Sequence, residues 1–158
     1  MPKSRPALLD SAFARTLLKY GSRAQAWFYR RSSGRIGGTW RLGAGLRKPV
    51  PTLLLEHRGR KSGRIFTAPL LYLMSGSDII IVASQGGMAR HPQWYFNLLA
   101  DPDTHVQIRA ERRPVRARVA TAQERDRLWP RLVELYADFD NYQSWTQRQI
   151  PVIVLSPR

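Results

Sequence analysis

The chain contains no cysteine and few acidic residues among its 158 residues. Without a thiol it can form no disulfide, no thiolate nucleophile and no cysteine-ligated zinc or iron–sulfur site, so any redox chemistry must come from a bound cofactor. Eleven Asp and Glu against 26 Lys and Arg give a net charge of +15. We therefore expect a negatively charged partner: nucleic acid, an anionic membrane surface or a polyanionic small molecule.

Long hydrophobic runs are also missing. The longest apolar segments, such as residues 68–74 and 79–83, fall far short of the ~20 residues that span a bilayer. Asp10 and Arg15 interrupt the apolar residues near the N-terminus, which argues against a secretory signal. We expect a cytoplasmic protein, with an arginine-rich transit peptide over residues 1–35 as the minor alternative.

Residues 9–28 predict a basic amphipathic helix, because apolar residues recur at three- and four-residue steps with cations between them. The apolar positions are Leu9, Phe13, Leu17, Tyr20, Ala24, Trp27 and Phe28. This stripe packs on the domain in the simpler interpretation; in the other it lies on anionic lipid headgroups at the inner face of the cell membrane. The glycine-rich residues 32–45 predict a connector. We expect residues 1–45 to form the helix and connector, and residues 46–158 the cofactor-binding body.

The body predicts a mainly β fold of the α+β class, with short helices. Hydrophobic and alternating runs indicate six strands, over residues 52–57, 64–74, 78–84, 106–110, 114–120 and 150–155. Turns are expected at residues 75–78 and 111–113, and helices at 92–99, 122–136 and 142–149. Because no βαβ rhythm is present, six strands favour a small barrel over a parallel doubly wound sheet.

The first candidate site is the segment Arg58-Gly59-Arg60-Lys61-Ser62-Gly63-Arg64, which joins two predicted strands. Its glycines allow backbone N–H groups to converge, while its cations and its serine add donors for an anion. The Walker A spacing is missing and a strand follows, so nucleotide hydrolysis is excluded. A solvated basic hairpin tip is the equally weighted alternative.

The second candidate covers residues 83–97. Gly86 and Gly87 end a strand and permit close approach of a flat ligand, and a helix begins nearby. Trp94 and Asn97 lie three apart and share one helix face. The alternative, in which Trp94 lies in the core and Asn97 is solvated, has the same weight as a ligand-binding face. The histidine of this segment, His91, has no partner at metal-ligand spacing, so no metal is expected.

The third candidate is an aromatic series, Tyr136, Phe139, Tyr142 and Trp145, spaced at three residues. Packing is the usual reason for such a series, but its phenols could also face a ligand.

Taken together, these segments resemble the deazaflavin-dependent nitroreductase family of actinobacteria, whose members use coenzyme F420. The resemblance is carried by Trp27-Phe28-Tyr29-Arg30-Arg31, Gly34-Arg35-Ile36-Gly37-Gly38, Gly59-Arg60-Lys61-Ser62-Gly63-Arg64, Pro69-Leu70-Leu71-Tyr72, Ala83-Ser84-Gln85-Gly86-Gly87, His91-Pro92-Gln93-Trp94-Tyr95-Phe96-Asn97-Leu98, Tyr142-Gln143-Ser144-Trp145-Thr146 and Ile150-Pro151-Val152. These motifs occur in the family order and cover nearly the whole chain.

The resemblance implies a split β-barrel and hydride transfer from reduced F420 to an organic acceptor: a quinone, a nitro compound or an activated enone. Its cofactor carries a phosphate and a polyglutamate tail, which suits the charge of +15. The implied contacts are Arg60, Lys61 and Ser62 for the phosphate and tail, Phe66, Thr67, Pro69, Leu70, Ser84, Gln85, Gly86 and Gly87 for the ring, and Gln93, Trp94 and Asn97 from the helix.

On the acceptor side, the family commonly carries a tyrosine cluster before the last strand. Tyr136 and Tyr142 match it and are the implied proton donors, but Phe139 stands between them where a phenol would be expected. All three are the implied substrate contacts. This departure weakens the expectation of nitroimidazole activation and leaves cofactor binding untouched. Two alternatives stay open: an FMN-binding split-barrel reductase, and a basic nucleic-acid-binding module that would use the arginines of residues 112–118.

Overall fold

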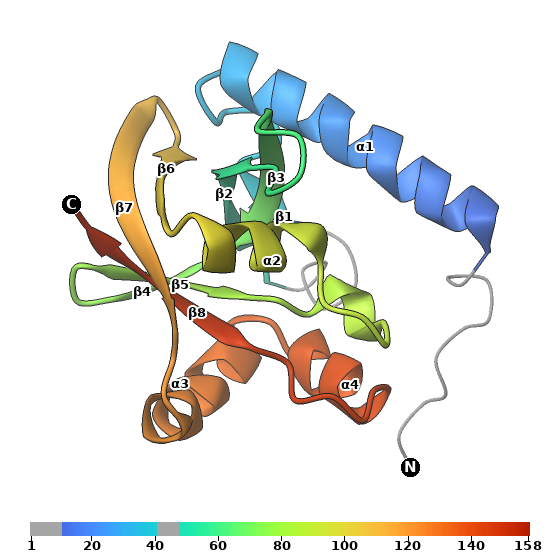
Figure 1. Cartoon of the computed structure of the whole chain (residues 1–158), viewed down its shortest axis with the longest axis vertical. Helices are drawn as coiled ribbons and strands as arrows, with labels where there is room; N and C mark the ends of the chain where they lie inside the picture. Colours follow the sequence, from blue (N-terminus) through green and yellow to red (C-terminus); the bar gives the residue numbers. More distant parts are fainter. Residues whose placement is uncertain (1–10, 41–47) are drawn as a thin grey trace.

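The computed structural model describes residues 11–40 and 48–158 (Figure 1). The predictions for residues 1–10, including Leu9 of the helix stripe, and for residues 41–47 of the connector lie outside these ranges. The described elements are α1 (Ala12–Arg31), β1 (Thr39–Trp40), β2 (Val50–Arg58), β3 (Ile65–Leu71), β4 (Leu73–Ser75), β5 (Asp78–Val82), the 3-10 turn η3 (Gln85–Gly87), α2 (Gln93–Ala100), β6 (Asp103–Ile108), β7 (Glu111–Val119), α3 (Ala122–Leu135), α4 (Asp138–Ser144) and β8 (Val152–Pro157).

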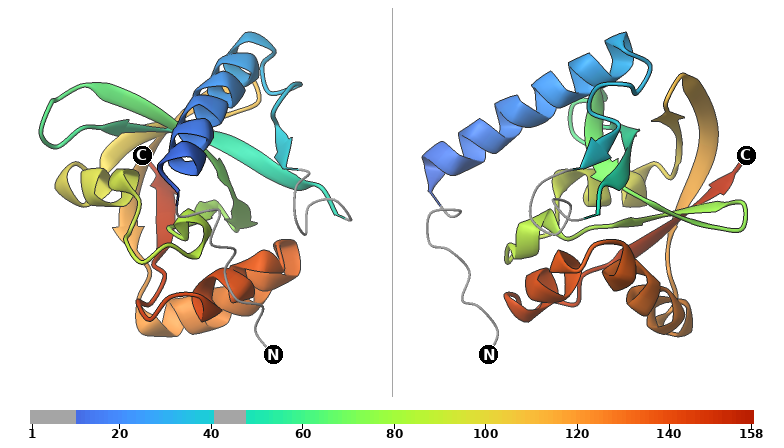
Figure 2. Two further views of the ribbon diagram at one scale, coloured as in Figure 1. Left: turned by 90° about the vertical axis from the view of Figure 1, so that its right-hand side faces the viewer. Right: turned by 180° about the vertical axis from the view of Figure 1, so that it is seen from behind.

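The strands form one curled antiparallel sheet in the order β1-β2-β6-β7-β8-β5-β4, with β3 paired to β2. Helix α1 lies at one end of the molecule, while α3 and α4 lie at the opposite end (Figures 1 and 2). The predicted α+β barrel is therefore confirmed, with eight described strands in place of six.

Strands β5 and β8 are continuous hydrophobic runs because both of their faces are covered. Ile79 and Ile81 of β5 pack into the inner core with α2, whereas Ile80 and Val82 pack against α3 and α4. β8 alternates in the same way between the two cores. Strand β7 instead buries Val115 and Ala117 and exposes Arg116 and Arg118, as its alternating sequence predicts, although Val119 at its end is also exposed.

Two of the predicted strand boundaries were wrong for tertiary reasons. The predicted strand over residues 64–74 is divided at Tyr72, where the chain leaves its partner β2 and pairs with β5 instead. The turn predicted at residues 111–113 lies earlier, since Ile108 already pairs with Glu111. Arg109 in that turn adopts a left-handed φ of 56°, and its N–H donates to the hydroxyl of Tyr29 at 2.7 Å. The hairpin turn before Asp78 is confirmed.

The helix predicted at residues 142–149 was also misplaced, because α4 begins at Asp138 and ends at Ser144. Phe139 is buried in the core beside α3, which draws the start of the helix forward. The side chain of Gln143 then holds the following segment in a non-helical course, by donating to the Arg148 carbonyl and accepting from the N–H of Ile150.

Helix α1 does not bury the predicted stripe over its described positions, from Phe13 to Phe28. Its Phe13 and Leu17 side chains are 76% and 63% exposed. The helix is anchored near its C-terminal end through Ala26 and the fully buried Tyr29, whose hydroxyl also donates to the Thr52 carbonyl at 3.1 Å. The packing interpretation of the stripe was therefore wrong. None of the described helices combines the length and the hydropathy that crossing a membrane requires.

Candidate functional site

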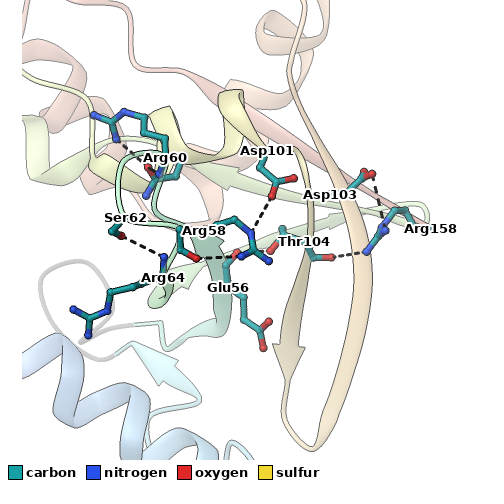
Figure 3. Close-up of polar contacts among 11 residues, drawn as sticks. Glu56, Arg58, Arg60, Ser62, Arg64, Asp101, Asp103, Thr104 and Arg158 are labelled. Atoms are coloured by element: carbon teal, nitrogen blue, oxygen red, sulfur yellow. Dashed lines mark hydrogen bonds and ion pairs between the residues drawn. The ribbon is translucent and has the colours of Figure 1, made fainter.

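The loop between β2 and β3, residues 58–64, is closed by its own backbone. The Gly59 N–H donates to the Arg64 carbonyl at 2.8 Å, and the Gly63 N–H donates to the Gly59 carbonyl at 2.7 Å. A Cβ atom at Gly59 would lie 2.6 Å from the Ser62 hydroxyl and 2.8 Å from the Phe66 ring, so a larger residue there would displace both side chains. The Ser62 hydroxyl accepts from the Arg64 N–H (Figure 3). The loop is thus a built structure with its cations outside.

Arg60 joins this loop to helix α2. Its backbone N–H and its guanidinium both donate to the Asn97 side-chain oxygen, at 3.2 and 2.9 Å, and the guanidinium also donates to the Gln93 oxygen at 3.0 Å. The guanidinium lies 5.2 Å from the centre of the Phe96 ring. The two segments that the sequence assigned to one ligand are therefore in direct contact.

Asn97 is buried, not solvated, and connects Arg60 to His57. The Asn97 amide nitrogen lies 3.0 Å from His57 Nδ1. Because an amide nitrogen only donates, His57 Nδ1 must be the acceptor and the ring is neutral. Burial lowers the pKa of His57 to about 4. Phe66, an implied ring contact, stacks on this histidine with ring centres 5.7 Å apart.

The cations of the 58–64 loop differ from the arginines of β7 in their partners. Arg58 approaches Asp101 at 3.4 Å (Figure 3), and all four arginines of β7 lie within 3.1 Å of a carboxylate. By contrast, Lys61 and Arg64 are exposed and form no ion pair within the described part of the chain. The positive charge available to a ligand is therefore found on the loop and not on β7.

The two glycines of the turn after β5 serve different purposes. Gln85, Gly86 and Gly87 all have positive φ, at 45°, 60° and 75°. A Cβ atom at Gly86 would meet open space, whereas one at Gly87 would lie 2.8 Å from the Tyr142 carbonyl oxygen and 3.1 Å from the Trp145 ring. Gly86 thus leaves the turn open to a ligand, and Gly87 lets it pack on α4.

Two implied contacts are core residues. The Trp94 side chain is 7% exposed and packs in the inner core, so it does not form an open aromatic wall. Phe139 is 4% exposed and packs against Trp129 and Tyr136. Its burial gives it a packing role and leaves almost no surface for an acceptor.

The two tyrosines lie together as the sequence predicted. The Trp40 indole N–H donates to the Tyr136 hydroxyl at 3.2 Å, and the Tyr136 and Tyr142 hydroxyl oxygens are 3.2 Å apart. Tyr136 is buried and Tyr142 is half-buried. Burial raises the pKa of both phenols, so both are neutral and carry a proton near neutral pH.

Three further implied ring contacts lie on β3 beside α1, and Ser84 immediately precedes the glycine turn. Thr67, Pro69 and Leu70 are half-buried, and the Thr67 hydroxyl accepts from the Arg30 guanidinium. Sequence reasoning missed Arg30, which looked like one of many cations on a helix face. It also missed His57 and Arg148, a residue that donates to the carbonyls before and after the glycine turn. A cavity of about 250 Å³ also lies among the described residues, but none of its lining residues belongs to the implied site.

Comparisons with known proteins found a matching family model, related sequences and solved structures of similar fold. A family model described as F420H(2)-dependent quinone reductase matches residues 21–157. A Mycobacterium tuberculosis (strain H37Rv) protein named for this activity is 66% identical over 118 residues, which cover 75% of this chain and 99% of that protein. An F420H(2)-dependent quinone reductase of the same strain is 39% identical over 133 residues, 82% of this chain and 85% of its own. The solved structure of an F420-H2 dependent reductase superposes with a TM-score of 0.63 at 36% identity, covering 67% of this chain and 94% of that one.

The pKa of His57 predicts a pH-dependent stability. Its folded value of about 4 lies below the unfolded value of 6.5, so the stabilisation is complete above pH 6.5 and is lost as the pH falls toward 4. We expect this histidine to account for about 2 kcal/mol of the free energy of unfolding lost between pH 7 and pH 5.

Urea denaturation of the wild type and of His57→Gln, at both pH values, measures this loss. The glutamine keeps an acceptor for Asn97, and His91, whose pKa is also lowered, is present in both proteins and cancels in the difference. The wild type should lose more stability than the variant. Equal losses would contradict the assignment.

Proposed function

Because the chain belongs to the F420H(2)-dependent quinone reductase family, we propose that it reduces a quinone with reduced F420 and binds this cofactor across the 58–64 loop, helix α2 and the glycine turn. One observation carries the proposal. Arg60 ties the cationic loop to α2 through Asn97 and Gln93, while the neighbouring cations stay exposed. A multiply charged ligand can therefore bind to cations that the fold already holds in place.

The donor set suits the anionic part of F420. Lys61 and Arg64 offer charge without a carboxylate partner in the described ranges, and Ser62 lies between them in the sequence. Cationic and hydroxyl donors on a glycine loop are the groups that bind phosphates and carboxylates. We assign the phosphate and tail to Arg60, Lys61 and Ser62, with Arg64 as a further cation.

The ring of the cofactor is assigned to the surface between β3 and the glycine turn. We assign its contacts to Phe66, Thr67, Pro69, Leu70, Ser84, Gln85, Gly86 and Gly87. When bound, reduced F420 supplies the hydride, and the protein supplies orientation and exclusion of water. Phe66 is supported from behind by the His57 ring, and Gly86 faces open space. Gln93 and Asn97 act by holding Arg60, and Trp94 acts by supporting α2 from the core.

The tyrosine pair is assigned to proton delivery at the acceptor. The Tyr136 oxygen already accepts from Trp40, so donation from Tyr136 to Tyr142 uses each group once and leaves the Tyr142 hydrogen free. Tyr142 would then protonate the quinone oxygen, and Tyr136 would position it. Nitro compounds and activated enones, which the resemblance also implied, could accept from the same phenol.

The two alternative functions have less support. Family membership favours F420 over FMN. A nucleic-acid interface on β7 would have to break the ion pairs of Arg112, Arg113, Arg116 and Arg118 with nearby carboxylates.

The exposed face of α1 has the composition of a lipid-binding surface. Phe13, Leu17 and Tyr20 are exposed on a helix that has cations and no acidic residue between Ala12 and Arg31. We propose that this face binds anionic lipid, which also holds apolar quinones.

Removal of the exposed loop cations tests the cofactor site. The double variant Lys61→Ala/Arg64→Ala should bind oxidised and reduced F420 about tenfold more weakly or worse, with a smaller dependence of Kd on salt, because two charge-assisted contacts are lost. The control Lys19→Ala/Arg127→Ala removes the same charge from α1 and α3. Fluorescence titration gives Kd for each protein. Unchanged affinity in the loop variant, or equal weakening in both, would remove the assignment.

Tyr142→Phe tests the proton donor. The variant should lower kcat for quinone reduction about a hundredfold, the lower range for general acid catalysis, with little change in Kd for F420. Tyr136→Phe should cost less because it acts through Tyr142. Tyr95→Phe, a phenol on α2, is the control. Steady-state kinetics measure these effects, and a Tyr142→Phe enzyme with the wild-type kcat would rule out the role.

Sedimentation with phospholipid vesicles tests the lipid surface. The wild type should bind phosphatidylglycerol vesicles more strongly than phosphatidylcholine vesicles, and Phe13→Ser/Leu17→Ser should lose most of this binding. Thr16→Ser on the same helix is the control. If the double variant sediments as the wild type does, the α1 face is not the lipid-binding surface.

A further inference from the structure

Arg148 lies in the segment between α4 and β8 and reaches the glycine turn after β5. Its Nε donates to the Met88 carbonyl at 2.9 Å, and its Nη2 donates to the Ser84 carbonyl at 2.8 Å. Its Nη1 donates to the Ala83 carbonyl at 3.1 Å and to His91 Nδ1 at 2.8 Å. Four of the five guanidinium N–H groups are therefore used on one segment of the chain.

The turn needs such support from outside. Gln85, Gly86 and Gly87 are three successive residues with positive φ, and for Gln85 this conformation costs roughly 1–2 kcal/mol. Only two backbone bonds of the turn are its own, from the Gly87 N–H to Ser84 and from the Met88 N–H to Gln85. Strained backbone persists where the surroundings fix it. Arg148 binds carbonyls on both sides of these three residues and so holds the two ends of the turn together.

The direction of these carbonyls determines where the turn presents its donors. In a trans peptide the C=O and the following N–H point in opposite directions, and the described chain contains no cis peptide. Because the Ala83 and Ser84 carbonyls point at the guanidinium, the N–H groups of Ser84 and Gln85 point away from it. An N–H of this kind can donate to a carbonyl or ring nitrogen of a flat heterocycle.

The bonds of Arg148 are all to neutral acceptors, and no carboxylate pairs with it within the described ranges. Gln143 fixes the backbone of Arg148 by donating to its carbonyl at 2.8 Å. Tyr142 and Trp145, which precede Arg148 in the chain, lie against Gly87. Residues 142–148 thus support the turn from two directions and also include the assigned proton donor, Tyr142.

We propose that Arg148 is a positioning residue for cofactor binding, which aims the Ser84 and Gln85 N–H groups at the deazaflavin ring by holding the carbonyls behind them. The proposal rests on the proposed function, since it takes the ring to lie at this turn. Holding three carbonyls at once depends on the planar, forked guanidinium of arginine and not on its charge alone, so lysine is not an adequate replacement.

The test compares Arg148→Ala and Arg148→Lys with Arg131→Ala, a control in which another arginine loses donations to the Met74 carbonyl and the Ser75 hydroxyl. Both Arg148 variants should bind F420 roughly tenfold more weakly, equivalent to about 1.4 kcal/mol. Millimolar guanidinium should restore affinity to Arg148→Ala alone, and sodium chloride at equal ionic strength should not. Wild-type affinity in both Arg148 variants, or rescue of Arg148→Ala by sodium chloride as well as by guanidinium, would overturn the proposal.

A second readout needs no cofactor. Amide hydrogen exchange at residues 84–88 should accelerate in Arg148→Ala and stay unchanged in Arg131→Ala, and guanidinium should slow it again. If Arg148→Ala does not fold, Arg148→Lys carries both measurements, and wild-type exchange and affinity in that variant would overturn the proposal. If the wild type itself binds no F420 while exchange responds to Arg148, the proposed function fails and only the support of the turn stands.

Discussion

The contact between Arg60 and Asn97 is the constraint on which the candidate site depends. It closes the cationic loop onto α2 and places two segments about 35 residues apart in the sequence on one surface. Asn97 can serve both partners because a buried neutral histidine accepts from its nitrogen while its oxygen faces Arg60. A buried amide with both ends satisfied adopts one orientation, so the loop is held in place before a ligand arrives.

The acceptor side is tied to the same surface through α4. Gly87 can approach the Tyr142 backbone because it has no side chain, and Phe139 packs α4 against α3. A change in α4 would therefore move the glycine turn and the tyrosine pair together.

The charged residues are divided between paired and exposed positions. Carboxylates pair with the arginines of β7, whereas the cations of the loop and of α1 face outward. Part of the net charge of +15 is thus exposed on the loop and on α1, where a polyanion or a lipid surface could use it.

Most elements of the fold could be predicted from local sequence patterns. Periodicity located the hydrophobic strands, the Thr121 capping box located α3, and glycine with serine located the hairpin before Asp78. The errors came from contacts between distant segments. The position of the β6–β7 turn is set by the contact of Arg109 with Tyr29, and the start of α4 is set by the burial of Phe139. Helix α1 is anchored by its C-terminal end and not by its apolar stripe. The convergence of loop and helix was predictable from the motifs. The roles of His57 and Arg148 were not, because each is defined by partners more than 35 residues away.

The most direct test of a shared site is an NMR titration of the ¹⁵N-labelled protein with oxidised F420. The account predicts that amide signals of residues 60–63 and of residues 84–87 shift along the titration with one common midpoint, while those of residues 75–78 in the β4–β5 hairpin stay in place. Shifts confined to one of the two segments, or two separate midpoints, would contradict the claim that loop and turn bind one molecule.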